Sequence, residues 1–265
     1  MSSKIREQET SKYWDCNASG WAEGIKNGQD YINESFGIPR FLDFIGNVSG
    51  KNIMDAGCGE GRSSRHLAEQ GARVTGVDLS LQMINRAIEM EKKKPLGIKY
   101  SQSSCSDLPF LNNKTFDFVC SIMALMDFPD IAKAFKEFKR VLKPGGHLTF
   151  MIRHPCFFTK GYGFLKNKQG VRARLLVSDY FIRREYIERW GFKTEGHGEN
   201  NTIFAIPRFP HKISDYFNCI LDEGFLLRRV LEPRPSVENT LQNPNLLFWR
   251  DNAALFLFVH AQKPE

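Results

Sequence analysis

The amino-acid sequence predicts an α/β protein built on a doubly wound, mostly parallel sheet. Between positions 51 and 153, short apolar runs alternate with amphipathic stretches. A glycine-rich turn follows the first apolar run. The first two apolar runs each end near an acidic residue, Asp55 in the first and Asp78 in the second. Strands that alternate with helices of about ten to fifteen residues form βαβ units, and the crossovers between parallel strands are right-handed.

The segment 51–153 is expected to supply five strands and three helices. The strands are expected at 51–56, 72–77, 98–102, 116–123 and 147–153. The helices are expected at 62–70, 80–94 and 131–142, and they end at Gly71, Pro95 and the turn 144–146. Glycine and proline directly after an apolar-periodic stretch are typical helix stops.

The regions on either side of this segment differ in pattern. Residues 1–50 are expected to be helical, with an amphipathic helix after Pro39, and to form a lid. Residues 154–210 are rich in aromatics, glycine and arginine, which predicts an inserted substrate cap with strands at 180–190 and 201–206. A helix at 212–223 and strands at 225–231 and 254–261 are expected to complete the α/β domain (51–153 and 211–265), with a loop at 233–252.

Composition narrows the class of protein. The chain has 265 residues, of which 42% are hydrophobic and 25% charged, as in soluble globular proteins. No apolar run approaches the ~18–20 residues of a membrane span, and the charged N-terminus lacks a signal core, so we expect a cytoplasmic protein. Six cysteines without a C-x-x-C pair predict neither a metal site nor a disulfide framework.

The glycine-rich turn NIMDAGCGEG (52–61) carries the strongest functional signal. Its glycines, Gly57, Gly59 and Gly61, follow G-x-G-x-G rather than the G-x-G-x-x-G spacing of dinucleotide-binding proteins. Asp55 stands just before the first glycine, where it would repel a pyrophosphate but attract an ammonium or sulfonium group, directly or through water. The turn therefore predicts a ligand that is cationic at its reactive end.

Asp78 ends the second strand, where a carboxylate can accept hydrogen bonds from both hydroxyls of an unphosphorylated ribose. The alternative is that Asp78 caps the next helix. Ser80 already fits that role, which favours the ribose interpretation.

These stretches resemble the class I S-adenosylmethionine-dependent methyltransferases, in the group of the ubiquinone and menaquinone biosynthesis enzymes. The resemblance is carried by MDAGCGEGRSSRHLAEQGARVTGVDLS, DLPFLNNKTFDFVCS and FKEFKRVLKPGGHLTF. It implies a Rossmann-like, seven-stranded sheet whose last strand is antiparallel. It also implies S-adenosylmethionine as cofactor, S-adenosylhomocysteine as product and a small-molecule methyl acceptor.

The resemblance also implies a set of cofactor-binding residues. One departure stands out, because the family usually has an aspartate that contacts the adenine amino group where this chain has Ser104. Met83 is expected against the adenine ring, although it suits a core position equally, and Ser121 near the methionine moiety. The expected cofactor contacts are Asp55, Gly57, Cys58, Gly59, Gly61, Asp78, Leu79, Met83, Ser104, Cys105, Ser121, Trp14 and Trp21.

The acceptor is expected between the lid, the loop after Ser121 and the cap. His154 directly follows the fifth strand and is the first candidate for a general base, although a purely structural role is an equal alternative. His211 and Tyr180 are weaker candidates, and a cysteine nucleophile at Cys156 is a further alternative. The expected acceptor contacts are Tyr13, Tyr31, Tyr180, Arg183 and His211.

Three functions remain open on the sequence alone. The first is methyl transfer to an O, N or C atom of a small molecule, by a monomer or homodimer. The second is methylation of tRNA or rRNA, which the net charge of +7 suits but the lack of a recognisable RNA-binding appendage disfavours. The third is a protein that binds the cofactor without transferring its methyl group.

Overall fold

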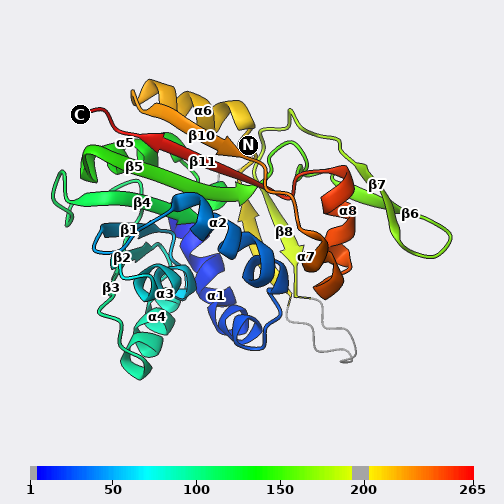
Figure 1. Cartoon of the computed structure of the whole chain (residues 1–265), viewed down its shortest axis with the longest axis horizontal. Helices are drawn as coiled ribbons and strands as arrows, with labels where there is room; N and C mark the ends of the chain where they lie inside the picture. Colours follow the sequence, from blue (N-terminus) through cyan, green and yellow to red (C-terminus); the bar gives the residue numbers. More distant parts are fainter. Residues whose placement is uncertain (1–4, 193–202) are drawn as a thin grey trace.

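The computed structural model describes residues 5–192 and 203–265, and its centre is a seven-stranded sheet in the order β10-β11-β5-β4-β1-β2-β3 (Figure 1). The strands are β1 (Asn52–Ala56), β2 (Arg73–Asp78), β3 (Lys99–Gln102), β4 (Phe116–Ile122), β5 (Leu142–Arg153), β10 (Leu226–Leu231) and β11 (Phe256–Gln262). β11 runs antiparallel to both β5 and β10, and the other pairings are parallel. This confirms the mostly parallel sheet with an antiparallel last strand.

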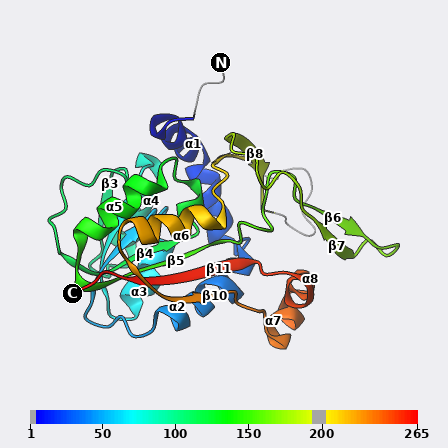
Figure 2. The same cartoon turned by 90° about the horizontal axis from the view of Figure 1, so that it is seen from above.

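Helices cover both faces of the sheet (Figures 1 and 2). They include α3 (Arg62–Glu69), α4 (Leu81–Lys93), α5 (Ile131–Val141) and α6 (Ile213–Asp222). Side chains alternate between the faces, so that Met54 of β1 joins the core under α5 and α6 while its neighbour Ile53 joins the core under α3. Within the described residues, no helix combines the length and the apolar character that crossing a membrane requires.

The N-terminal segment is helical, as expected. It forms α1 (Glu7–Lys26), a π-helical turn (Asn33–Gly37) and α2 (Ile38–Ile45). α2 packs on β11, where the ring of Phe41 meets that of Phe258 edge to face. α1 instead packs against α4 and against β9 (Phe204–Arg208) of the insertion, so it lies beside the carboxyl ends of the parallel strands.

The insertion after β5 contains two antiparallel pairs of strands. β6 (Gly163–Lys166) and β7 (Arg172–Leu176) form a hairpin that projects from the body of the molecule (Figure 2). β8 (Tyr186–Trp190) pairs with β9.

The strands of the insertion differ from those expected from the sequence. The hairpin was not predicted, because its short strands are mostly exposed and lack a buried alternation. The strand expected at 180–190 begins only at Tyr186. For the strand expected at 201–206, positions 201 and 202 lie outside the described residues, and β9 runs on to Arg208.

The loop expected at 233–252 is wrong, because this segment forms α7 (Val237–Gln242) and α8 (Asn245–Asn252). The side chain of Ser236 caps α7 by accepting a hydrogen bond from the backbone N–H of Asn239. α8 buries Trp249, whose ring stacks on that of Phe158 from the insertion. Packing against a distant segment thus stabilises α8, whereas α7 buries no side chain and relies on its cap.

Candidate active site

A cavity of about 920 Å³, open to solvent, lies at the carboxyl ends of β1, β2 and β4, beside α1. Ligands of open α/β sheets bind at this edge, because parallel strands deliver their carboxyl ends and the following loops to one place. The structure brings together ten of the residues expected to bind the cofactor: Trp14, Trp21, Gly57, Cys58, Gly59, Asp78, Leu79, Met83, Ser104 and Cys105.

The glycine-rich loop after β1 forms the floor of this cavity. Gly57 has φ 77°, and a Cβ at this position would lie only 2.4 Å from the Cβ of Ala124, so a side chain does not fit. The N–H of Gly59 donates a hydrogen bond of 2.8 Å to Oδ2 of Asp78, which ties the loop to β2. Gly61 does not line the cavity; with φ 90° it is the N-cap of α3.

Asp78 is held in a defined orientation at the cavity wall. Its Oδ2 accepts from Gly59, and its Oδ1 accepts from the N–H of Ser80 at 2.8 Å. The Ser80 hydroxyl itself caps α4 by accepting from the N–H of Met83, so Asp78 is not the helix cap. A carboxylate has about four acceptor sites, which leaves capacity for two ribose hydroxyls.

The wall of the cavity is rich in carboxylates. Glu7, Glu60, Asp78 and Asp127 contribute acidic groups to it, alongside the guanidinium of Arg62. Burial raises the pKa of Glu60, Asp78 and Asp127 above their usual values. A cationic ligand would favour the ionised carboxylates, so this lining fits a sulfonium and an ammonium group.

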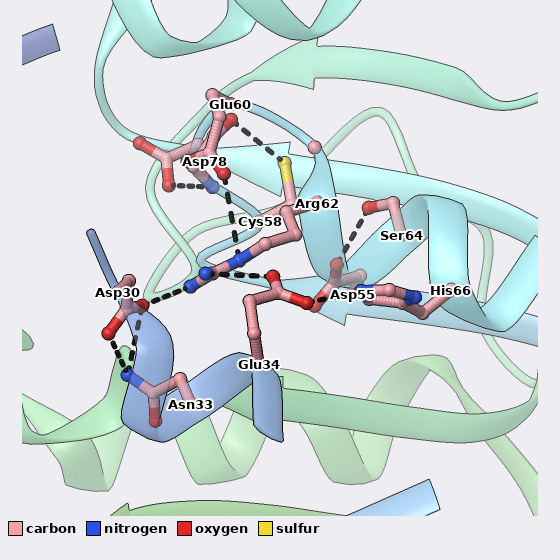
Figure 3. A network of polar contacts seen from close by, with 12 residues as sticks. Asp30, Asn33, Glu34, Asp55, Cys58, Glu60, Arg62, Ser64, His66 and Asp78 are labelled. Atoms are coloured by element: carbon pink, nitrogen blue, oxygen red, sulfur yellow. Dashed lines mark hydrogen bonds and ion pairs between the residues drawn. The ribbon is translucent and has the colours of Figure 1, made fainter. Parts of the chain in front are cut away.

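Arg62 connects the N-terminal segment to the glycine-rich loop (Figure 3). Its guanidinium contacts Asp30 at 2.7 Å and Glu34 at 3.0 Å, and its Nε lies 3.9 Å from Glu60. Asp30 lies before the π-helical turn and Glu34 lies in it. Glu60 lies in the glycine-rich loop, and Arg62 begins α3 directly after it. This contact was not predicted, because the sequence has no signal for which arginine meets which acidic residue.

Two of the expected cofactor contacts lie beneath the loop rather than at the cavity wall. Oδ2 of Asp55 accepts from the hydroxyl of Ser64 at 2.6 Å (Figure 3). Its Oδ1 is buried and has no hydrogen-bond partner in the described part of the chain. Burial raises the pKa of Asp55 to about 7. The hydroxyl of Ser121 donates to the carbonyl of Ala56 at 2.9 Å. This placement does not support a direct ligand contact for Asp55 or Ser121.

The loop after β4 leaves the sheet through a strained residue. Met123 has φ 59°, a left-handed conformation that non-glycine residues rarely adopt, and it lines the cavity together with Ala124. Such strain costs about 1–3 kcal/mol and is concentrated at functional sites.

A second cavity, of about 650 Å³, lies behind this loop, between β5, α6 and the insertion. Hydroxyl-bearing side chains contribute much of its wall: Thr159, Tyr162, Tyr180, Tyr186 and Tyr216. Thr159 is 8% exposed, and its Oγ1 is buried without a hydrogen-bond partner among residues 5–192 and 203–265. An unpartnered buried hydroxyl is costly, which favours a polar ligand group at this position.

The segment 126–128 separates the two cavities. Met126 lines the second cavity, whereas Asp127 lines the first and pairs with Arg208 of the second. Nε2 of His211 lies 2.8 Å from the carbonyl oxygen of Phe128. Since a carbonyl only accepts, Nε2 carries the proton and Nδ1 is the acceptor nitrogen of the ring. Burial lowers the pKa of His211, which keeps the ring neutral.

His154, the first candidate for a base, does not reach either cavity wall. Its ring is 3% exposed, with Nε2 2.6 Å from Glu232 and Nδ1 accepting from the N–H of Cys156 at 3.3 Å. Both ring nitrogens are thus used inside the protein. The geometry favours the structural alternative, in which His154 fastens the bend after β5 to the end of β10.

Three of the five residues expected to contact the acceptor also lie away from the cavity walls. Tyr13 is on α1 but lines neither of these two cavities, and Tyr31 is 40% exposed. Arg183 forms an exposed ion pair with Asp215. The remaining two, Tyr180 and His211, line the second cavity.

Comparison with known proteins agrees with this geometry. Residues 54–150 match the family model described as a methyltransferase domain. The chain is 32% identical over 203 residues to a ubiquinone biosynthesis O-methyltransferase of Alkalilimnicola ehrlichii, covering 70% of this chain and 76% of that protein. It is also 32% identical over 170 residues to a demethylmenaquinone methyltransferase of Tropheryma whipplei, covering 60% of this chain and 70% of that protein.

The fold matches solved structures as well. An S-adenosylmethionine-dependent methyltransferase from Mesorhizobium loti superposes with a TM-score of 0.68 at 27% identity, over 89% of this chain and all of that one. A second such structure, described as a possible methyltransferase from Listeria monocytogenes, has a TM-score of 0.65 at 24% identity and likewise covers 89% of this chain.

Proposed function

Because this chain belongs to the class I S-adenosylmethionine-dependent methyltransferases, we propose that it methylates a hydroxyl group of a small aromatic acceptor held in the second cavity. The observation that carries the proposal is the composition of that cavity, where four phenol rings and the hydroxyl of Thr159, which has no hydrogen-bond partner among the described residues, line the wall beside charged side chains such as Arg153 and Glu188. The Alkalilimnicola relative is named for O-methylation in ubiquinone biosynthesis, which supports the same acceptor class.

The first cavity is proposed to hold the cofactor. The bound cofactor supplies an electrophilic methyl group on a sulfonium. Asp78 is proposed to accept hydrogen bonds from the ribose hydroxyls, and the acidic wall to attract the cationic end. Trp14 and Trp21 of α1 line the same cavity, where their rings exclude water and attract a sulfonium by cation–π interaction.

His211 is proposed to take the acceptor's proton. Nδ1 of His211 would accept the hydroxyl proton as the methyl group of a bound cofactor passes to the acceptor oxygen, and the cofactor would leave as the neutral thioether. The neutral ring is suited to this role, because burial lowers its pKa and the Phe128 carbonyl selects the tautomer. His211 thus replaces His154 as the candidate base.

Transfer requires the acceptor hydroxyl to pass the segment 126–128, which separates the two cavities. We infer that the side chain of Met126 moves when the acceptor binds, whereas Asp127 and Phe128 keep their contacts with Arg208 and His211. Met126 lies three residues after the strained Met123, and a strained backbone can favour a second conformation.

The proposal is tested with labelled S-adenosylmethionine and a panel of acceptors. We expect transfer to catechols such as 3,4-dihydroxybenzoate and caffeate, and little transfer to phosphoethanolamine, the substrate named for another relative. Thr159→Val should raise KM for the aromatic acceptor and leave the cofactor affinity unchanged. Preferred transfer to phosphoethanolamine would contradict the proposed acceptor class. Transfer to tRNA with a steep salt dependence would instead support an RNA methyltransferase.

A further inference from the structure

Glu7 and Ser104 meet at one end of the cofactor cavity. The hydroxyl of Ser104 donates a hydrogen bond of 2.8 Å to Oε1 of Glu7, although the two residues are 97 positions apart. Glu7 lies in the first turn of α1 and Ser104 in the loop after β3, and both line the cavity. A carboxylate from the lid therefore reaches the edge of the sheet.

The strand order indicates which part of the cofactor lies there. The neighbouring strands β4, β1, β2 and β3 deliver Met123, the glycine-rich loop, Asp78 and Ser104 to one edge in that order. Three strand spacings of about 4.8 Å span roughly 14 Å, enough for an extended nucleoside with its amino-acid chain. With the ribose at Asp78 and the methyl group near the loop after β4, the purine ring lies toward β3.

The side chains at this end suit a purine. Leu79 and Met83 provide apolar surface on the β2 side, next to Cys105. The hydroxyl of Ser104 is already engaged on both sides, since it donates to Glu7 and accepts from the N–H of Ser106 at 3.0 Å. The Glu7 carboxylate has acceptor sites beyond the one that Ser104 uses, and a carboxylate can only accept.

We propose that Glu7 accepts a hydrogen bond from the exocyclic amino group of the cofactor's adenine, so that the lid helix itself recognises the base. The inference rests on the proposed placement of the cofactor in the first cavity and not on the proposed acceptor. A purine with a carbonyl in place of the amino group would face the carboxylate with a second acceptor and would be rejected.

Other contacts hold α1 in place independently of Glu7. The hydroxyl of Ser11 donates to the carbonyl of Leu79 at 3.1 Å. Oδ1 of Asp15 accepts from the hydroxyl of Ser80 at 2.6 Å and from the N–H of Gln82 at 3.0 Å. Substituting Glu7 by glutamine should therefore change base recognition without detaching the helix.

The test is calorimetry of S-adenosylhomocysteine and of S-inosylhomocysteine, in which a carbonyl replaces the purine amino group. The wild-type protein should prefer the adenine ligand by about 10- to 100-fold, as expected for one hydrogen bond to a charged group. In Glu7→Gln the preference should fall to a few-fold, because an amide can donate to the carbonyl. In Glu7→Ala the preference should also fall, with weaker binding of S-adenosylhomocysteine.

A matched control separates recognition from a structural contact. Glu23→Gln makes the same change at an exposed position of α1 and should keep the wild-type preference. The proposal is overturned if Glu7→Gln and Glu7→Ala both keep the wild-type preference. Because no acceptor is present, neither result depends on the acceptor assignment.

Discussion

Asp127 and Arg208 form a buried ion pair that joins the wall of the first cavity to the wall of the second cavity. Asp127 is 6% exposed in the turn after β4, and Arg208 ends β9 of the insertion, where its guanidinium also contacts Glu188 at 2.6 Å. Glu188 in turn lies 3.4 Å from Arg153 at the end of β5. This network fastens the inserted β8–β9 pair to the carboxyl edge of the sheet.

Breaking this network should destabilise the protein strongly. Arg208→Leu leaves Asp127 and Glu188 buried without their shared cation, a change that typically costs about 3–5 kcal/mol. The free energy of unfolding in urea measures this cost. Arg183→Leu is the matched control, because the Arg183–Asp215 pair is exposed on the arginine side and should contribute about 1 kcal/mol or less. If both variants lose the same small amount of unfolding free energy, the buried network is not needed for stability.

The two histidines should differ in their effects on turnover. His211→Asn should lower kcat by about 10²- to 10⁴-fold, the usual contribution of a general base, with little change in the affinity for S-adenosylhomocysteine. His154→Asn should keep kcat within a few-fold and lower Tm, because it loses the bond to Glu232. Since burial lowers the pKa of His211, the acid limb of the wild-type rate should lie below pH 6.5. A large loss of kcat in His154→Asn, with His211→Asn unaffected, would reverse the assignment.

Asp55 should make the stability of the ligand-free protein fall as pH rises. Its pKa is raised by burial from 3.8 to about 7, so the folded state binds a proton that the unfolded state has released between these values. The contribution of Asp55 to the free energy of unfolding is therefore greatest below pH 3.8. This contribution falls by about 4 kcal/mol at most as the pH rises to about 7. Comparing the urea unfolding of wild type and Asp55→Asn at pH 5 and pH 8 measures this contribution, because the amide does not titrate.

In that comparison, wild type should lose more stability than Asp55→Asn on going from pH 5 to pH 8. The same substitution should weaken binding of S-adenosylhomocysteine above pH 7, where an ionised Asp55 would attract the ammonium group. An identical pH dependence in the two proteins would mean that Asp55 is already ionised at pH 5.

Removal of α1 should abolish cofactor binding while the sheet still folds. Trp14 and Trp21 pack with Phe192 and Phe204 in a small cluster that is separate from the cores on either side of the sheet. A variant lacking residues 1–26 should therefore keep a cooperative urea transition but lose measurable affinity for S-adenosylhomocysteine. Wild-type affinity in this variant would show that α1 is not part of the cofactor site.

The sequence by itself determined the sheet, the order of its first five strands along the chain and the position of the glycine-rich loop. These features depend on local rules: apolar residues repeat with the period of a strand or a helix, and Gly57 adopts a conformation that side chains disfavour. The position of Asp78 in the wall of the first cavity could also be predicted. A carboxylate at the carboxyl end of a parallel strand lies at the edge of the sheet where ligands bind.

Only the tertiary structure decided which distant side chains meet. The contacts of Glu7 with Ser104 and of Asp127 with Arg208 join segments that are about 80 to 100 residues apart, and no periodicity encodes such a pairing. The same holds for the histidines, since His154 follows a strand that ends at the binding edge, yet its ring turns away toward Glu232 while His211 reaches the second cavity. Position along the chain specifies where a strand ends, but packing decides which way the next side chain points.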